Sequence, residues 1–271
     1  MNNHPQLKDQ YHVSIVLMVG NSRLHWALFI DKTLYSTGDT FHLSASIIQQ
    51  LAQYPTLDNW LTAISLPNNL PIIPDCPIPL ILASVVPSQT ALWQSYPHLH
   101  IITLEDVPLQ RMYPTLGIDR ALAVWGAGIT WGFPILVIDA GTALTFTGAD
   151  NHQCFVGGAI LPGLGLQFAS LGQKTGQLPL LKPGLMISLP LHFAMNTSDA
   201  IQSGVIYTLL SGIKDFIEAW WRLFPGSQVV MTGGDSNLLK TYLYQQVPDI
   251  AERLIVDNYL IFQGIGNIVI K

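Results

Sequence analysis

Two turns in the sequence combine glycine with small polar side chains directly after an apolar segment. The turn residues are Gly20, Asn21 and Ser22 in the first turn, and Gly141 and Thr142 in the second. Glycine lets a ligand approach the backbone closely, and amide and hydroxyl donors suit phosphate oxygens. One such turn is equally compatible with an ordinary hairpin. Two matching turns favour a site that holds a triphosphate from two sides.

Asp139 stands at the end of the apolar segment 135–139, where α/β sheets commonly bind ligands. A carboxylate in such a place is unfavourable unless it is solvated or paired with a cation or hydrogen-bond donors. We therefore interpret Asp139 as a residue that holds a metal–nucleotide complex or a monovalent cation. The alternative is an aspartate that caps the turn.

Asp119 and Arg120 open a predicted helix at 119–130, in a region with few other charges. Phosphoryl transfer to an alcohol needs a group that orients the hydroxyl and accepts its proton, and Asp119 is a candidate. Arg120 is a candidate for bidentate binding of a substrate carboxylate. The alternative is a charged helix N-terminus with a surface ion pair.

Gly233 lies between a predicted strand at 227–231 and a helix that begins at Ser236. A glycine there allows a flat adenine ring to lie against the backbone, although an ordinary strand–helix loop is the alternative. The glycine pair 163 and 165 lacks the third glycine of a dinucleotide fingerprint, and no P-loop pattern occurs.

The elements that must position these residues alternate between strands and helices, which indicates an α/β fold. Strands are predicted at 13–19, 24–31, 32–36, 80–85, 135–139, 142–148, 154–160 and 227–231. Helices are predicted at 43–53, 119–130, 163–172, 199–222 and 258–268, and two further helices begin at residues 87 and 236. Residues 66–79 are predicted to form an irregular connection. Segments 18–29 and 139–150 share one order of strand, glycine turn and strand. This repeat predicts a duplicated β-β-β-α-β-α unit, with lobes at 1–112 and 113–271 and a nucleotide cleft between them.

The composition excludes several classes of protein. The 271 residues are 49% hydrophobic and 11% charged, with a net charge of −5, so a large core is expected and attraction to nucleic acid or an anionic membrane is not. No apolar stretch is long enough to span a membrane, and no signal peptide is evident, so we expect a cytoplasmic protein. Cys76 and Cys154 are expected to be free thiols, and no zinc-ligand spacing occurs.

Several motifs occur in one order along most of the chain: Met-Val-Gly-Asn-Ser at 18–22, Gly-Ile-Asp-Arg at 117–120, Asp-Ala-Gly-Thr-Ala at 139–143, Gly-Gly-Ala-Ile-Leu-Pro-Gly at 157–163, Asn-Thr at 196–197 and Thr-Gly-Gly at 232–234. In this order they resemble the motifs of the type III pantothenate kinases, which belong to the acetate and sugar kinase, heat-shock ATPase and actin superfamily. The resemblance implies two ribonuclease H-like lobes. It also implies ATP-dependent phosphorylation of pantothenate to 4′-phosphopantothenate, the first step of coenzyme A synthesis.

The resemblance also implies partners and roles. The family uses Mg²⁺ with ATP and a monovalent cation, K⁺ or NH₄⁺, and forms homodimers. The resemblance implies that Asp119 is the base and that Asp139 lies near the cations. The implied pantothenate contacts are Tyr113, Gly117, Arg120 and Thr197, of which Thr197 reaches a neighbouring subunit. The implied ATP contacts are Gly20, Asn21, Ser22, Gly141, Thr142 and Gly233.

One departure from the family pattern is Met18, which stands where the first phosphate motif begins with aspartate. The lost carboxylate leaves open a non-catalytic regulator that binds nucleotide or pantothenate, although Asp119 and Asp139 argue for an enzyme. A related kinase or phosphatase with another substrate is a third interpretation, and Arg120 favours a substrate with a carboxylate.

Overall fold

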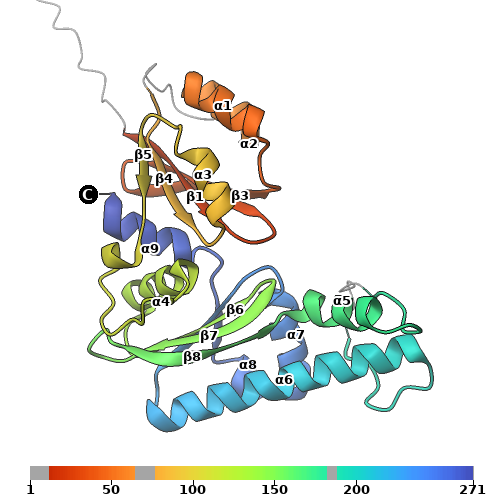
Figure 1. Cartoon of the computed structure of the whole chain (residues 1–271). Helices are drawn as coiled ribbons and strands as arrows, with labels where there is room; N and C mark the ends of the chain where they lie inside the picture. The colour runs from red at the N-terminus through yellow and green to blue at the C-terminus, as the bar shows by residue number, and fades with distance from the viewer. Residues whose placement is uncertain (1–11, 65–76, 182–187, 271) are drawn as a thin grey trace, which may run out of the picture. The chain divides into compact units, whose positions relative to one another are not determined.

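The computed structural model describes residues 12–64, 77–181 and 188–270 (Figure 1). Most of the irregular connection predicted at 66–79 therefore lies outside the described residues, as does Cys76. The chain divides into two compact units, Met1–Asp106 with Ile265–Lys271, and Val107–Gly264. Within the described ranges, no helix is long and apolar enough to cross a membrane.

The first unit contains a five-stranded sheet in the order β3-β2-β1-β4-β5. Its strands are β1 (Val13–Val19), β2 (Leu24–Ile30), β3 (Thr33–Thr40), β4 (Leu80–Ser84) and β5 (Leu99–Ile101). Strands β1, β2 and β3 pair antiparallel with one another, whereas β4 runs parallel to both β1 and β5. Strands β1 to β3 thus form a meander, whereas helices precede β4 and β5 in the chain.

The second unit repeats this topology. Its sheet, read from β8, has the order β8-β7-β6-β9-β10, with the same antiparallel and parallel pairings. The strands are β6 (Ile135–Ala140), β7 (Ala143–Ala149), β8 (Phe155–Pro162), β9 (Gln228–Thr232) and β10 (Leu254–Val256). Two sheets with one strand order confirm the two ribonuclease H-like units, since each contains the meander and the two parallel strands of that fold.

One face of the first sheet packs against α1 (Ala45–Gln53), α2 (Leu57–Ile64) and α3 (Pro87–Trp93), forming one core. Every second residue of β1 and β2 belongs to this core, as expected when a strand presents alternate side chains to one face. Ser44 caps α1 because its hydroxyl accepts a hydrogen bond from the Ile47 amide. On the opposite face, Phe29 lies against Gly266 of α9 (Leu260–Val269).

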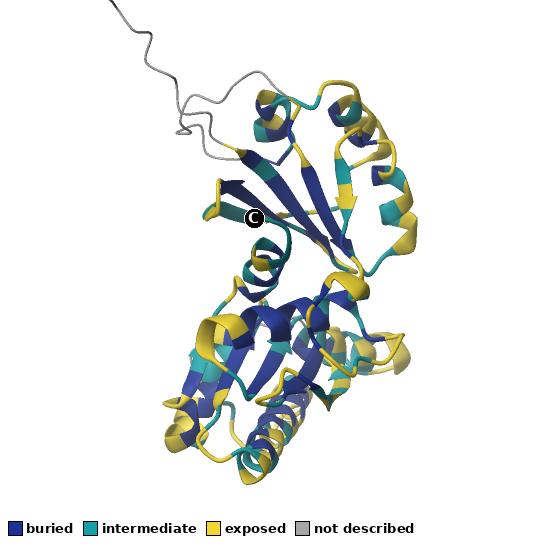
Figure 2. Cartoon of the chain, turned by 90° about the vertical axis from the view of Figure 1, so that its left-hand side faces the viewer, coloured by how far each residue is buried: buried dark blue, intermediate teal, exposed yellow. Residues whose placement is uncertain are grey.

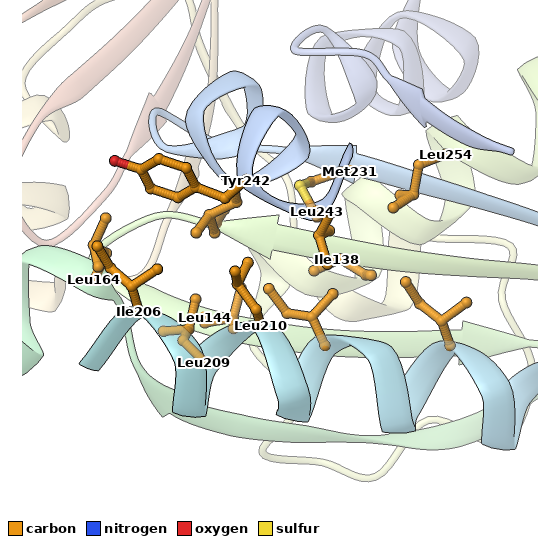
Figure 3. Close-up of a cluster of buried hydrophobic side chains, with 14 of the residues drawn as sticks. Ile138, Leu144, Leu164, Ile206, Leu209, Leu210, Met231, Tyr242, Leu243 and Leu254 are labelled. Atoms are coloured by element: carbon orange, nitrogen blue, oxygen red, sulfur yellow. The ribbon is translucent and has the colours of Figure 1, made fainter. Parts of the chain in front are cut away.

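The core of the second unit lies between its sheet and the helices α5 (Leu164–Lys174), α6 (Thr197–Leu223), α7 (Ser236–Gln246) and α8 (Pro248–Ala251). Figure 3 shows side chains of α6 and α7 directed toward those of β6 and β9. Within each unit the central strands are mostly buried, whereas β3, β5 and β8 are partly exposed, as are the outward sides of the helices (Figure 2). The remaining helix, α4 (Ile118–Trp131), packs against β6 and β7 on the other face.

The sequence-based elements are confirmed where a long apolar pattern supports them, and three corrections are needed. Strand β3 extends to Thr40 instead of ending near residue 36. Each sheet has a fifth strand, β5 or β10, that the predicted unit lacked. The short helices α2 and α8 were not predicted. Cys154 is a buried free thiol, as expected.

Candidate active site

Arg120 lies in the first turn of α4 and is buried, with 7% of its surface exposed. Its three guanidinium nitrogens each donate one hydrogen bond of 3.0 Å. Nε donates to the Thr147 hydroxyl, one terminal nitrogen to the Tyr113 hydroxyl, and the other to the Phe146 carbonyl. A guanidinium carries five N–H donors. With three donated to described groups, two remain for a ligand.

The burial of Arg120 rules out the surface ion pair that the sequence left open. A buried cation needs hydrogen-bond or charged partners. The three acceptors that bind the Arg120 guanidinium are neutral oxygens, so none of these hydrogen bonds pairs its positive charge with a carboxylate. An anionic substrate group would therefore find both charge and donors at this position.

Neighbouring residues fix the position of the Arg120 side chain. The Tyr113 ring packs edge-on against Phe155, with 5.5 Å between ring centroids. A Cβ at Gly158 would clash with the Phe146 carbonyl and an Arg120 terminal nitrogen, so β8 can pass this point only with glycine. Sequence reasoning placed Gly158 in a motif without this role, and it missed Thr147 and Phe155.

Asp119 precedes Arg120 in the same helical turn. Its Oδ1 accepts a hydrogen bond of 2.8 Å from the Arg120 backbone amide. A Cβ at Gly117, the N-cap of α4, would clash with the same oxygen. Burial raises the pKa of Asp119, although the amide hydrogen bond and the Arg120 charge oppose this shift. A carboxylate with a raised pKa accepts a proton more readily, which suits a general base.

Asp139 is the second-last residue of β6 and shares a face of that strand with Ile135 and Val137. This is the face covered by α4, so Asp139 comes close to Asp119 at the start of that helix. Burial, followed by the negative charge of Asp119, raises the pKa of Asp139 to about 7. When both are ionised, the two carboxylates therefore repel each other.

Two glycine turns enclose the Asp139 carboxylate. A Cβ at Gly233 would lie 2.5 Å from Asp139 Oδ1, and one at Gly141 would lie 3.3 Å from it. Gly233 also has φ +90°, which favours glycine. The Asp235 amide donates to the Ala140 carbonyl at 3.0 Å and thereby holds this loop against the end of β6.

The carboxylate pair fits a cation, because a positive ion would relieve the repulsion between Asp119 and Asp139. In the part of the chain that the structure describes, no three His, Cys, Asp or Glu side chains form a metal-binding group. Mg²⁺ commonly takes one or two carboxylates and completes its shell with phosphates and water. The residues present suit an ion that arrives with its nucleotide better than a permanently bound one.

The first glycine turn belongs to the other unit. It joins β1 to β2, and the Gly20 amide donates to the Arg23 carbonyl at 3.0 Å. Asn21 and Ser22 are exposed, whereas Met18 is 2% exposed. Within this unit, the turn is accessible to a ligand.

Thr197 is the first residue of α6 and is exposed. Asn196 caps this helix by accepting a hydrogen bond of 2.9 Å from the Asp199 amide. As far as the described residues show, Thr197 makes no hydrogen bond to Tyr113, Asp119 or Arg120. The second unit thus brings together Tyr113, Gly117, Asp119, Arg120, Asp139, Gly141 and Gly233, with Thr142 beside them in the β6–β7 turn and Thr197 elsewhere.

Comparison with known proteins gives consistent results. Residues 14–219 match the family model for type III pantothenate kinase. The type III pantothenate kinase of Nostoc sp. is 55% identical over 94% of both chains. That of Synechocystis sp. is 43% identical over 93% of this chain and 88% of the relative.

Two solved structures share the fold. The conserved putative Baf family transcriptional activator from Campylobacter jejuni has a TM-score of 0.56 and 20% identity, covering 94% of this chain and 96% of that one. The activator of 2-hydroxyisocaproyl-CoA dehydratase from Clostridium difficile, solved with bound ADPNP, has a TM-score of 0.53 and 10% identity, covering 95% and 93%.

Proposed function

Since the chain belongs to the type III pantothenate kinases, and its substrates are therefore ATP and pantothenate, we propose a role for each residue of the site. The observation that carries this proposal is the pairing of a buried arginine that keeps two donors with an adjacent carboxylate of raised pKa. The first suits the carboxylate of pantothenate, and the second suits its hydroxyl.

Asp119 acts as the general base. Because Oδ1 accepts the Arg120 amide hydrogen bond, Oδ2 is the oxygen directed to the pantothenate hydroxyl. The base accepts the proton as the hydroxyl oxygen forms its bond to the γ-phosphorus of ATP, and ADP leaves with the electrons of the broken P–O bond. Gly117 contributes by leaving room for this carboxylate.

Arg120 holds the pantothenate carboxylate with its two remaining donors. Tyr113 shapes the pocket and supports the guanidinium through its hydroxyl. Because Asp119 and Arg120 are adjacent in one helical turn, binding of the carboxylate fixes where the substrate chain runs and thus where its hydroxyl lies relative to the base.

Gly20, Asn21 and Ser22 in one turn, with Gly141 and Thr142 in the other, contact the phosphates of ATP through amides and hydroxyls. Gly233, with its positive φ and lack of a side chain, allows adenine to approach the backbone. Asp139 holds the cation that accompanies ATP, which we take to be Mg²⁺. A bound Mg²⁺ would neutralise charge on the transferred phosphoryl group. A second, monovalent cation, K⁺ or NH₄⁺, is proposed on the family resemblance.

We further propose a homodimer in which Thr197 reaches the pantothenate pocket of the second subunit. The segment before Thr197 exposes three large apolar side chains, Leu191, Phe193 and Met195, with 78%, 92% and 99% of their surface accessible. This segment is held against α6 by hydrogen bonds from Ser203 and Tyr207 to its carbonyls. A fixed, exposed apolar segment is typical of a surface that a partner covers.

The test of Asp119 is the Asp119→Asn variant in an ADP-release assay with pantothenate. We expect kcat to fall about 10²- to 10⁴-fold, while ATP affinity stays near the wild-type value. The matched control is Asp215→Asn, which alters an exposed carboxylate on α6 and should leave kcat unchanged. Wild-type turnover by the Asp119 variant would refute the assignment of the base.

A further inference from the structure

A row of three side chains crosses the first sheet beside the Gly20 turn. In the strand register, Met18 of β1 is opposite His25 of β2, and His25 is opposite Asp39 of β3. Directly opposite residues project from the same face of a sheet. The next pair toward the turn, Val19 and Leu24, is the last before the turn begins. The row therefore lies one residue from the turn that we assign to ATP phosphates.

His25 is oriented by its neighbours. Its Nδ1 lies 2.5 Å from Asp39 Oδ1, so the carboxylate accepts a hydrogen bond from that nitrogen. The other ring nitrogen, Nε2, would lie 3.6 Å from a Cβ placed on Gly20. The side chains of His25 and Asp39 are 43% and 54% exposed, so a ligand seated on the turn can reach the ring. Asp39 thus directs Nε2 of His25 toward the turn.

The surroundings of the turn favour an anion. His42 Nε2 donates to the Gly20 carbonyl at 2.8 Å, which occupies an acceptor that would otherwise repel phosphate oxygens. Arg23 adds a positive charge at the turn, with its guanidinium 5.3 Å from the centre of the Phe41 ring. The carboxylate of the row, Asp39, is engaged by His25. Met18 places no charge at the end of the row where the family motif has aspartate.

We propose that His25 donates a hydrogen bond from Nε2 to a phosphate oxygen of ATP at the Gly20 turn, with Asp39 as the counter-ion behind the ring. This inference rests on the proposed function, in which the phosphates of ATP bind at this turn. This arrangement requires a proton on each ring nitrogen, one directed to Asp39 and the other to the phosphate oxygen. His25 is then a substrate-contacting residue for the nucleotide.

The experiment compares the binding of ADP and adenosine by calorimetry for the wild type, His25→Ala and His25→Lys. Loss of one charge-assisted hydrogen bond should weaken ADP binding about tenfold or more. Adenosine, which has no phosphate, should bind equally well to all three proteins. Lysine restores a cation within reach of the turn and should recover most of the ADP affinity. The control is His98→Ala, an exposed histidine of the same unit, which should match the wild type.

Steady-state kinetics give a second readout. His25→Ala should raise the KM for ATP and leave the KM for pantothenate unchanged. Unchanged ADP affinity in His25→Ala, or an equal loss for ADP and adenosine, would overturn the inference, while ADP release by the wild type with pantothenate would still support the proposed function. Absence of that wild-type activity would instead reject the proposed function itself.

Discussion

Replacement of Arg120 by lysine tests the geometry of the site most directly, because the positive charge is kept and only the fork of donors is lost. The guanidinium uses three separate nitrogens to contact Tyr113, Phe146 and Thr147. A lysine ammonium is a single nitrogen and cannot reach three partners and also hold a carboxylate by two bonds.

The expected magnitude follows from these bonds. A hydrogen bond to a charged group contributes about 1.5–3 kcal/mol, and about 1.4 kcal/mol corresponds to a factor of ten. Loss of one of two bonds to pantothenate should therefore raise its KM about 10- to 100-fold. The KM for ATP should remain near the wild-type value, because the proposed ATP contacts lie in other loops.

The decisive comparison uses a neutral amide analogue of pantothenate in the same ADP-release assay. If Arg120 binds the carboxylate, the wild type prefers pantothenate to the amide strongly, and in Arg120→Lys this preference falls about 10- to 100-fold. A thermal melt checks folding, because Phe146 and Thr147 also lose donors in the variant. An equal rise in KM for pantothenate and for the amide would show that Arg120 has only a structural role.

Two further predictions concern Gly233 and Asp139. Gly233→Ala should lower the free energy of unfolding by about 1–3 kcal/mol, because alanine is strained at φ +90° and its Cβ meets Asp139 Oδ1. The control is Gly234→Ala, whose Cβ meets nothing within 4 Å. The measurement is urea unfolding, and equal losses of stability in the two variants would contradict the reasoning. The raised pKa of Asp139, about 7 against about 4 when unfolded, stabilises the fold fully below about pH 4, and this contribution is lost as the pH rises through about 7. Without nucleotide or divalent cation, the stability of Asp139→Asn relative to wild type should therefore rise over this range, by at most about 1.4 kcal/mol per pH unit, and a constant difference would speak against it.

Much of the fold was predictable because the apolar strands end at glycine turns. Strands β1 and β6 are almost wholly buried, so their apolar runs are unambiguous. Strand β3, with the sequence TLYSTGDT, is half-exposed and polar, and its extent was underestimated. Strands β5 and β10 have three residues each, too few for an alternating pattern to show.

The site was predictable only in part. Asp119, Arg120 and Asp139 belong to motifs with recognisable spacing. The groups that hold Arg120 do not, because Phe146 and Thr147 lie 26 and 27 residues farther along the chain and meet Arg120 only through tertiary packing. His25 and Asp39 are likewise brought together by the β2–β3 register. Contacts between elements depend on packing and register, which one sequence does not display.

The common strand order of the two sheets makes each half of the molecule an internal reference for the other. Each strand position in one sheet has a counterpart in the other sheet. Asp139 is the second-last residue of the first strand of its sheet, and Met18 holds the same place in the other. One sheet therefore carries an acid at this place, and the other carries a neutral thioether. Any charge that a nucleotide meets at the end of β1 must come from other residues of that unit.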